Sequence, residues 1–186
     1  MKTKLFSMLA VSLFTATCFA QSTEEPEFVG EAMLVNADQS HTLLEKQLTQ
    51  SRTAASTGLM LTGIGKVRTQ LQIDGCCSGI VLDKNKEVKL IIRGVDNLTD
   101  PLSIVRIFKF EKRKKYRRAE LAAVNNFGGA KRNNLDYVSF TGKKYGTSSY
   151  LINIPTLESG EYGITISNPN ALDEKQTVVS TFAVAE

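Results

Sequence analysis

From Phe28 onward, glycine, asparagine and aspartate divide the chain into short β-branched and aromatic runs. Turn signals such as Ile73-Asp74-Gly75 separate these runs, and leucines with helical spacing occur only over 42–50. Many short strands at close spacing are typical of a sandwich or barrel, not of a parallel α/β fold. The expected strands are 28–36, 42–52, 58–64, 67–73, 79–82, 88–93, 104–110, 117–124, 137–141, 149–154, 160–167 and 178–184.

The first twenty residues predict export from the cytoplasm. Met1-Lys2-Thr3-Lys4 is basic, 5–14 is an apolar run too short to span a bilayer as a helix, and Cys18-Phe19-Ala20 ends in a small residue. This order is typical of a secretory signal peptide over 1–20. No later stretch is long and apolar enough for a membrane span. We therefore expect a periplasmic, cell-surface or extracellular protein.

Removal of the signal peptide bounds what remains. Loss of Lys2 and Lys4 lowers the formal net charge from +4 to +2. The chain that starts at Gln21 is long enough for one well-buried core. We therefore expect a flexible leader over 21–27 and a single β-sandwich domain over 28–186.

The remaining cysteines, Cys76 and Cys77, are adjacent. Adjacent cysteines rarely bridge each other, because the linking peptide brings the two Cα atoms unusually close. Two free thiols, an intermolecular bridge and a vicinal disulfide therefore stay open. No histidine or further cysteine lies nearby to complete a tetrahedral metal site, and we expect no metal and no cofactor. Lipoprotein-type cleavage before Cys18 is the alternative to a simple signal, although Thr15 stands where such signals usually carry leucine.

The C-terminal third of the chain is its best-specified part. Leu157-Glu158-Ser159-Gly160-Glu161-Tyr162 forms an acidic-small-Gly-x-Tyr corner, and Ile164 and Ile166 continue the alternation after it. This stretch resembles the penultimate-strand region of immunoglobulin-like sandwiches. The whole chain also resembles uncharacterised secreted proteins of gut-type bacteria in the Bacteroidota.

These resemblances imply a fold class and a compartment, but no activity. The implied fold is all-β, an immunoglobulin-like antiparallel β-sandwich of about 8–11 short strands. In such domains the hydroxyl of the corner tyrosine, here Tyr162, bonds to backbone just upstream. Ile164 stands where antibody domains carry a disulfide cysteine, so that bridge is not expected.

Basic residues are most concentrated between Arg106 and Arg118, where Glu111 is the one acidic residue. If this run forms a strand or hairpin, its end beyond Phe110 projects into water as a basic ridge. Such a ridge can bind lipid A phosphates, an acidic glycan or another polyanion through many weak contacts. Alternatively, its lysines discourage edge-to-edge strand pairing, or the ridge contacts the chain's own acidic segments. The candidate anion-binding residues are Lys112, Arg113, Lys114, Lys115, Arg117, Arg118, Lys143 and Lys144.

A second candidate anion site is Phe127-Gly128-Gly129-Ala130-Lys131-Arg132-Asn133-Asn134. Paired glycines beside basic and amide residues can form a backbone nest for an anion. The stretch lacks the spacing and the Lys-Ser/Thr ending of a phosphate-binding loop, so no nucleotide site is expected. A flexible loop between two strands is the alternative.

Enzymatic readings find little support in the sequence. His41 is the single histidine, so a Ser-His-Asp triad or a cysteine nucleophile would depend on it. A carboxylate pair for glycoside cleavage could come from Asp96, Asp100, Glu120 and Asp136, which lie outside the acidic ends. The chain has no tryptophan for a sugar-binding platform. We therefore expect no enzymatic activity.

Together these patterns predict an exported bacterial β-sandwich that binds an anionic ligand through the basic ridge. The alternative is a structural or assembly component of the cell envelope, which pairs its strand edges with copies of itself or with an envelope protein. A glycan-active enzyme is a distant third reading.

Overall fold

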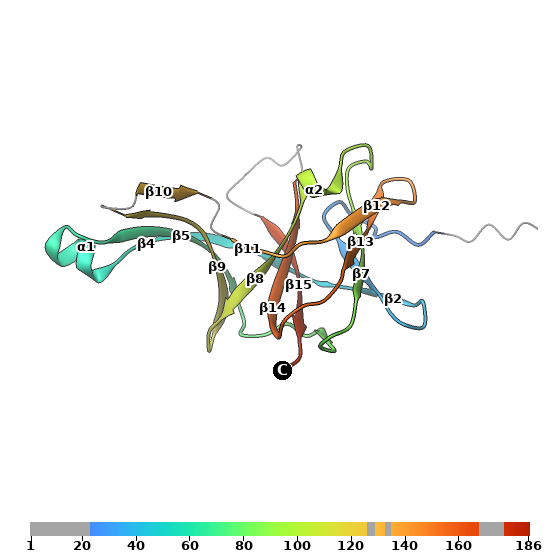
Figure 1. Cartoon of the computed structure of the whole chain (residues 1–186), viewed down its shortest axis with the longest axis horizontal. Coiled ribbons are helices and arrows are strands. Elements are labelled where there is room, and N and C mark those ends of the chain that lie inside the picture. The colour runs from blue at the N-terminus through green and yellow to red at the C-terminus, as the bar shows by residue number, and fades with distance from the viewer. Residues whose placement is uncertain (1–22, 126–128, 133–134, 168–176) are drawn as a thin grey trace, which may run out of the picture.

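Two β-sheets pack face to face to form the body of the protein, and a β-arm extends from one of them (Figure 1). The computed structural model describes residues 23–125, 129–132, 135–167 and 177–186. The two short helices are α1 (Thr57–Thr62) and α2 (Pro101–Ile104). The strands are β1 (Ala32–Val35), β2 (His41–Leu43), β3 (Glu45–Leu48), β4 (Gln50–Ala55), β5 (Lys66–Asp74), β6 (Val81–Leu82), β7 (Val88–Arg93), β8 (Val105–Lys112), β9 (Tyr116–Asn125), β10 (Gly129–Arg132), β11 (Asp136–Tyr137), β12 (Thr141–Tyr145), β13 (Ser149–Ile154), β14 (Gly160–Ile166) and β15 (Val178–Val184).

Two packed, mostly antiparallel sheets confirm the predicted all-β sandwich. The first sheet has the order β12-β13-β7-β1-β2, and the second has the order β3-β15-β14-β8-β9-β5-β4. Neighbours along both orders are antiparallel, whereas β6 pairs with β15 in parallel. The described residues form more strands than the predicted 8–11, because the arm and the short strands β6, β10 and β11 add to the sandwich.

The main core lies between the two sheets and follows the alternation of strand side chains. In β7, Val88, Leu90 and Ile92 are buried in this core, and in β13 Tyr150 and Ile152 meet them. Side chains of β8, β14 and β15 cover the same core from the second sheet. Lys89 and Ile91, the residues between them in β7, therefore face away from the core.

Tyr162 forms the predicted tyrosine corner. Its hydroxyl donates a hydrogen bond to the Glu158 carbonyl oxygen at 2.7 Å. Its ring stacks on Phe182 of β15 with the ring centroids 5.4 Å apart. Burial of the phenol raises the pKa of Tyr162. The corner therefore fixes the start of β14 against the core.

The arm consists of β4, β5, β9 and β10, with α1 at its far end (Figure 1). At its base, Leu71 and Ile73 pack in a second apolar cluster with Phe108, Phe110 and Val179. Neither β4 nor α1 buries a side chain. Packing therefore holds the base of the arm, and backbone pairing holds the rest.

The predicted strand 58–64 is wrong, because this stretch contains helix α1. The Ser56 side chain accepts a hydrogen bond from the Leu59 nitrogen at 3.4 Å and caps the start of the helix. Gly63, with φ of 71°, ends it in the left-handed conformation.

The helical leucine spacing over 42–50 is also not realised. This stretch forms β2 and β3, which pair with β1 and β15 in different sheets. Leu44 between them is buried, whereas Leu43 and Leu48 are exposed. The leucines therefore mark a crossing between sheets and not a helix face. The predicted strand 137–141 does not form as one strand either, because β11 ends at Tyr137 and β12 begins at Thr141.

Candidate functional site

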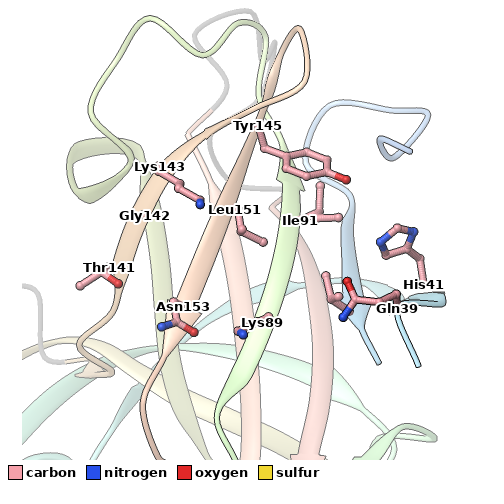
Figure 2. Close-up of a pocket in the computed structure, with 11 residues that line it drawn as sticks. Gln39, His41, Lys89, Ile91, Thr141, Gly142, Lys143, Tyr145, Leu151 and Asn153 are labelled. Carbon is pink, nitrogen blue, oxygen red and sulfur yellow. The ribbon is translucent and has the colours of Figure 1, made fainter. Parts of the chain in front are cut away.

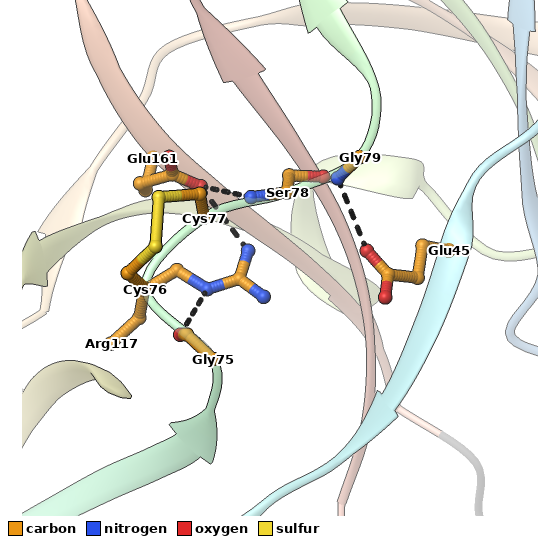
Figure 3. Close-up of a disulfide and its surroundings, with 8 residues drawn as sticks. All are labelled: Glu45, Gly75, Cys76, Cys77, Ser78, Gly79, Arg117 and Glu161. Atoms are coloured by element: carbon orange, nitrogen blue, oxygen red, sulfur yellow. Dashed lines mark hydrogen bonds and ion pairs between the residues drawn. A yellow bond between two sulfur atoms is a disulfide. The ribbon is translucent and has the colours of Figure 1, made fainter. Parts of the chain in front are cut away.

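The basic ridge forms the hairpin of β8 and β9, but Arg117 points into the protein (Figure 3). Its side chain is 1% exposed, and its Nη1 lies 3.2 Å from Oε2 of Glu161, which is 4% exposed. Its Nε also donates to the Gly75 carbonyl oxygen at 3.3 Å. Ala119, two residues further along β9, is buried on the same side. Arg117 is therefore a structural cation and not a ligand contact.

Other basic residues of the ridge also have partners within the chain. Arg113 and Arg118 both contact Glu111, and the Arg118 Nε–Glu111 Oε2 distance is 2.5 Å. The hydrogen bond from Arg118 is the main reason that the pKa of Glu111 is lowered. Lys109 contacts Glu158 at 2.9 Å. Half of the eight basic residues between Arg106 and Arg118 therefore pair with the protein's own carboxylates, and two of these four share Glu111.

Three exposed lysines remain at the hairpin turn, namely Lys112, Lys114 and Lys115. Among the residues that the structure describes, they form no ion pair. Lys143 and Lys144 lie on β12 at the edge of the other sheet, away from this hairpin (Figure 1). The structure therefore does not join the eight predicted residues into one surface.

Half of the predicted anion nest over 127–134 lies outside the described residues. Residues 126–128 and 133–134 belong to the undescribed part of the chain. Gly129–Arg132 forms β10, whose backbone pairs with β9.

A hollow of about 490 Å³ lies on the outer face of the first sheet (Figure 2). Lys89 and Ile91 of β7 and Leu151 and Asn153 of β13 face it, because their strand neighbours face the core. The other residues around it are Val35, Gln39, His41, Thr141, Gly142, Lys143 and Tyr145.

The hollow combines the half-buried Leu151 with two lysines, Lys89 and Lys143, and Ile91 beside Leu151 is fully buried. Ile91 is opposite Leu151, and Leu151 is opposite Lys143, so these three form one row across the sheet. The next row along the strands places Lys89 opposite Asn153. The Lys89 ammonium is 3.3 Å from the Glu87 carboxylate. Lys143 forms no ion pair with any residue for which the structure gives a position.

The flexible leader was predicted over 21–27, and its described residues, 23–27, make specific contacts beside this hollow. The Glu25 carboxylate accepts four hydrogen bonds of 2.6–3.1 Å from Thr147, Ser148 and Ser149. Burial alone would raise the pKa of Glu25, but these bonds outweigh it and lower the pKa from 4.5 to about 2. Glu24 Oε2 lies 2.7 Å from Nδ1 of His41.

Two acidic side chains therefore sit beside His41 and Tyr145 at one end of the hollow. Burial is the main reason that the pKa of the Tyr145 phenol is raised, and the negative charges of Glu24 and Glu25 add to it. The phenol stays neutral at physiological pH and can both donate and accept a hydrogen bond.

Cys76 and Cys77 form a disulfide with each other in the segment between β5 and β6 (Figure 3). The structure thus selects the vicinal bridge from the three options that the sequence left open. The next residue, Ser78, donates its backbone N–H to Glu161 Oε2 at 2.9 Å. The same carboxylate therefore holds both Arg117 and the disulfide-bearing segment.

Most of the candidate catalytic residues form ion pairs or accept hydrogen bonds from nearby backbone. His41 contacts Glu24. Asp96 and Asp100 accept backbone hydrogen bonds in the turn before α2 and at its start. Glu120 lies 3.3 Å from Arg68, and Asp136 is exposed on β11. In the described parts of the chain, no group of three or more histidine, cysteine, aspartate or glutamate side chains is placed to hold a metal ion.

Among the predicted anion-binding residues, only Lys143 lies at the hollow. Lys89 was missed because a single lysine inside an apolar strand gives no signal until the register of β7, β13 and β12 is known. Within the described residues, no helix has the length and apolar character needed to cross a membrane. Comparison of the chain with protein-family models and with curated proteins finds no match.

Proposed function

We propose that this protein is an exported, non-enzymatic binding module that holds an anionic saccharide in the hollow on the first sheet. One observation carries the proposal: Lys89 and Lys143 stand beside the half-buried Leu151 on the outer face of the first sheet, where Ile91, the strand neighbour of Leu151, is fully buried. A solvent-facing side of an antiparallel sheet is usually polar. An apolar floor with a few convergent polar groups is instead typical of a ligand site.

The chemistry of the hollow fits a sugar that carries an acidic group. The half-buried Leu151 can cover part of the apolar face of a sugar ring, and the Tyr145 ring lies near it (Figure 2). Ile91 is fully buried and supports Leu151 from within the sheet. Gln39 and Thr141 supply amide and hydroxyl groups for sugar hydroxyls. The Asn153 amide nitrogen already donates to Glu87 at 2.6 Å, and its Oδ1 is the atom left to accept a hydrogen bond.

The Lys143 ammonium, which forms no ion pair within the described residues, then attracts a carboxylate or sulfate, and the Lys89 ammonium adds to this although it also contacts Glu87. This proposal keeps the anionic ligand expected from the sequence but moves its site from the ridge to the hollow.

Export is part of this proposal and rests on the basic, apolar and small order of residues 1–20. We place the protein in the periplasm, on the cell surface or outside a bacterial cell of the Bacteroidota type.

Matched saccharides test the proposal. The protein is titrated with sialyllactose and lactose, and with oligogalacturonate and its neutral methyl ester. We expect binding of the acidic member of at least one pair, and affinity at least tenfold weaker for the Lys89→Gln/Lys143→Gln variant. The Lys114→Gln/Lys115→Gln variant of the hairpin turn should bind as the parent does. Loss of binding in the hairpin variant alone would return the site to the ridge.

A second candidate function, assembly with copies of itself or with an envelope protein, is favoured by the free edge of the arm. Strand β4 ends the second sheet, is mostly exposed, and carries Arg52 as its one charged residue. Such an edge can accept another strand. Sedimentation velocity at micromolar concentration should then show oligomers in the parent and monomers in a Thr53→Pro variant.

A further inference from the structure

We propose that the far end of the arm inserts into the surface of an anionic lipid bilayer. This arm tip comprises residues 56–65, with α1 at its centre. Its apolar side chains point into solvent: Met60 is 75% exposed, Leu61 79% and Ile64 56%. Clustered apolar side chains at a projecting end mark an interaction surface.

Hydrogen bonds hold the tip in one conformation, and this conformation keeps the apolar side chains exposed. The Ser56 Oγ accepts hydrogen bonds from the backbone nitrogens of Leu59 and Lys66. The Gly63 N–H donates to the Leu59 carbonyl oxygen at 3.1 Å. A Cβ on Gly65 would lie 2.7 Å from the Leu59 nitrogen, so the turn closes only around glycine.

The stem of the arm carries positive charge behind the apolar tip. Between Gln50 and Gln72 the chain has Arg52, Lys66 and Arg68 but no aspartate or glutamate. Arg68 contacts Glu120, whereas Arg52 and Lys66 form no ion pair within the described residues. The backbone register of β10 places Lys131 and Arg132 along the same stem, opposite Ala123 and Ala122 of β9.

This pattern is complementary to an anionic membrane surface. Apolar side chains at the tip enter the boundary between headgroups and acyl chains, and the cations behind them meet lipid phosphates. A bilayer accommodates a small convex tip of any shape.

A protein partner fits the tip less well. Stable protein interfaces bury about 800 Å² per partner and centre on tyrosine, tryptophan or arginine anchors. The tip is one short helix with methionine, leucine and isoleucine exposed. It also lies at the opposite end of the molecule from the first sheet (Figure 1), so the hollow would stay open while the tip is in lipid.

A single fluorophore tests the insertion directly. The chain contains no tryptophan, so Leu61→Trp introduces a unique one at the tip. Leu98→Trp is the matched control, because Leu98 is also 79% exposed but lies on the sandwich body. Both variants, from Gln21 onward, are mixed with vesicles of phosphatidylethanolamine and phosphatidylglycerol, or with vesicles of phosphatidylcholine alone. We expect a blue shift and quenching by brominated acyl chains for Leu61→Trp with the anionic vesicles, and no change for Leu98→Trp.

Loss variants complete the test. Met60→Ser/Leu61→Ser/Ile64→Ser should reduce cosedimentation with the anionic vesicles at least tenfold, and Arg52→Gln/Lys66→Gln should weaken it in a salt-dependent way. An unshifted Leu61→Trp spectrum, or a triple serine variant that binds as the parent does, would overturn the proposal. Self-association through the tip without vesicle binding would also overturn it and assign the tip to a second copy of the chain. Saccharide binding is measured without lipid, so the two proposals fail separately.

Discussion

Arg117 shows how a residue in a charge-rich segment can be structural. It stands in a run of basic residues, yet it is buried against Glu161. Strand alternation with Ala119 could have placed Arg117 on the inner side of β9. No sequence signal identifies Glu161 as its partner, because the two residues meet only when β14 and β9 are placed. Arg117 was therefore predicted on the surface of the ridge, whereas its side chain is buried.

We predict that Arg117→Ala destabilises the protein by about 3–5 kcal/mol, because it leaves the Glu161 carboxylate buried without its cation. Urea unfolding of the parent and the variant measures this difference. Arg118→Ala is the matched control. Its pair with Glu111 is partly exposed, and we expect a loss below about 1 kcal/mol. Equal losses in the two variants would contradict the structural role of Arg117.

Glu25 should make the stability depend on pH. Its pKa in the folded protein is about 2 instead of 4.5, so it contributes stability that is complete above about pH 4.5. That contribution is lost as the pH falls towards 2. Between these values the free energy of unfolding should fall more steeply in the parent than in Glu25→Gln. At pH 7 the variant should be less stable by about 1–2 kcal/mol, because it loses hydrogen bonds to a carboxylate. Parallel pH curves for the two proteins would show that residues 23–27 do not dock as the structure has them.

The vicinal disulfide should contribute little to global stability. A bridge between neighbours closes almost no chain, and the entropy removed from the unfolded state grows with the length of the closed loop. Cys76→Ser/Cys77→Ser should therefore change the free energy of unfolding by less than about 1 kcal/mol. The parent should run as a monomer on a non-reducing gel. A disulfide-linked dimer would contradict the intramolecular bridge.

At the scale of elements, short apolar runs are ambiguous between strand and helix. The run over 58–64 contains leucine and methionine, which are good helix formers, and Ser56 and Gly63 cap it as helix α1. The capping residues were visible in the sequence, and the length of the run favoured a strand. By contrast, the Gly-x-Tyr corner identified β14 correctly, because its hydrogen bond is local.

The Ser56 cap provides the test at this scale. Ser56→Ala removes the acceptor for two backbone N–H groups and should cost about 1 kcal/mol of local stability. Hydrogen exchange should accelerate at Leu59 and Lys66. Ser51→Ala in the exposed strand β4 is the control and should leave exchange at the tip unchanged. Protection that persists in Ser56→Ala would mean that the tip is held by other contacts.

At the scale of the whole molecule, the two-sheet sandwich was predictable and the arm was not. Alternation and turn residues identify strands, but they do not say that β4 pairs with β5, and β5 with β9, beyond the body. The hollow likewise depends on β12, β13 and β7 lying in register. Both candidate surfaces therefore depend on pairs of strands that lie far apart in the sequence, β5 with β9 for the arm and β7 with β13 for the hollow.

We propose that an anionic saccharide binds in the hollow. The most direct test of this proposal is a ¹⁵N–¹H NMR titration of the protein from Gln21 onward with sialyllactose, and with lactose as the neutral control. We predict that sialyllactose shifts amide signals of Lys89, Ile91, Lys143, Leu151 and Asn153, and that lactose shifts them less. Shifts confined to 112–118 in the β8–β9 hairpin, or equal shifts with both sugars, would contradict the account.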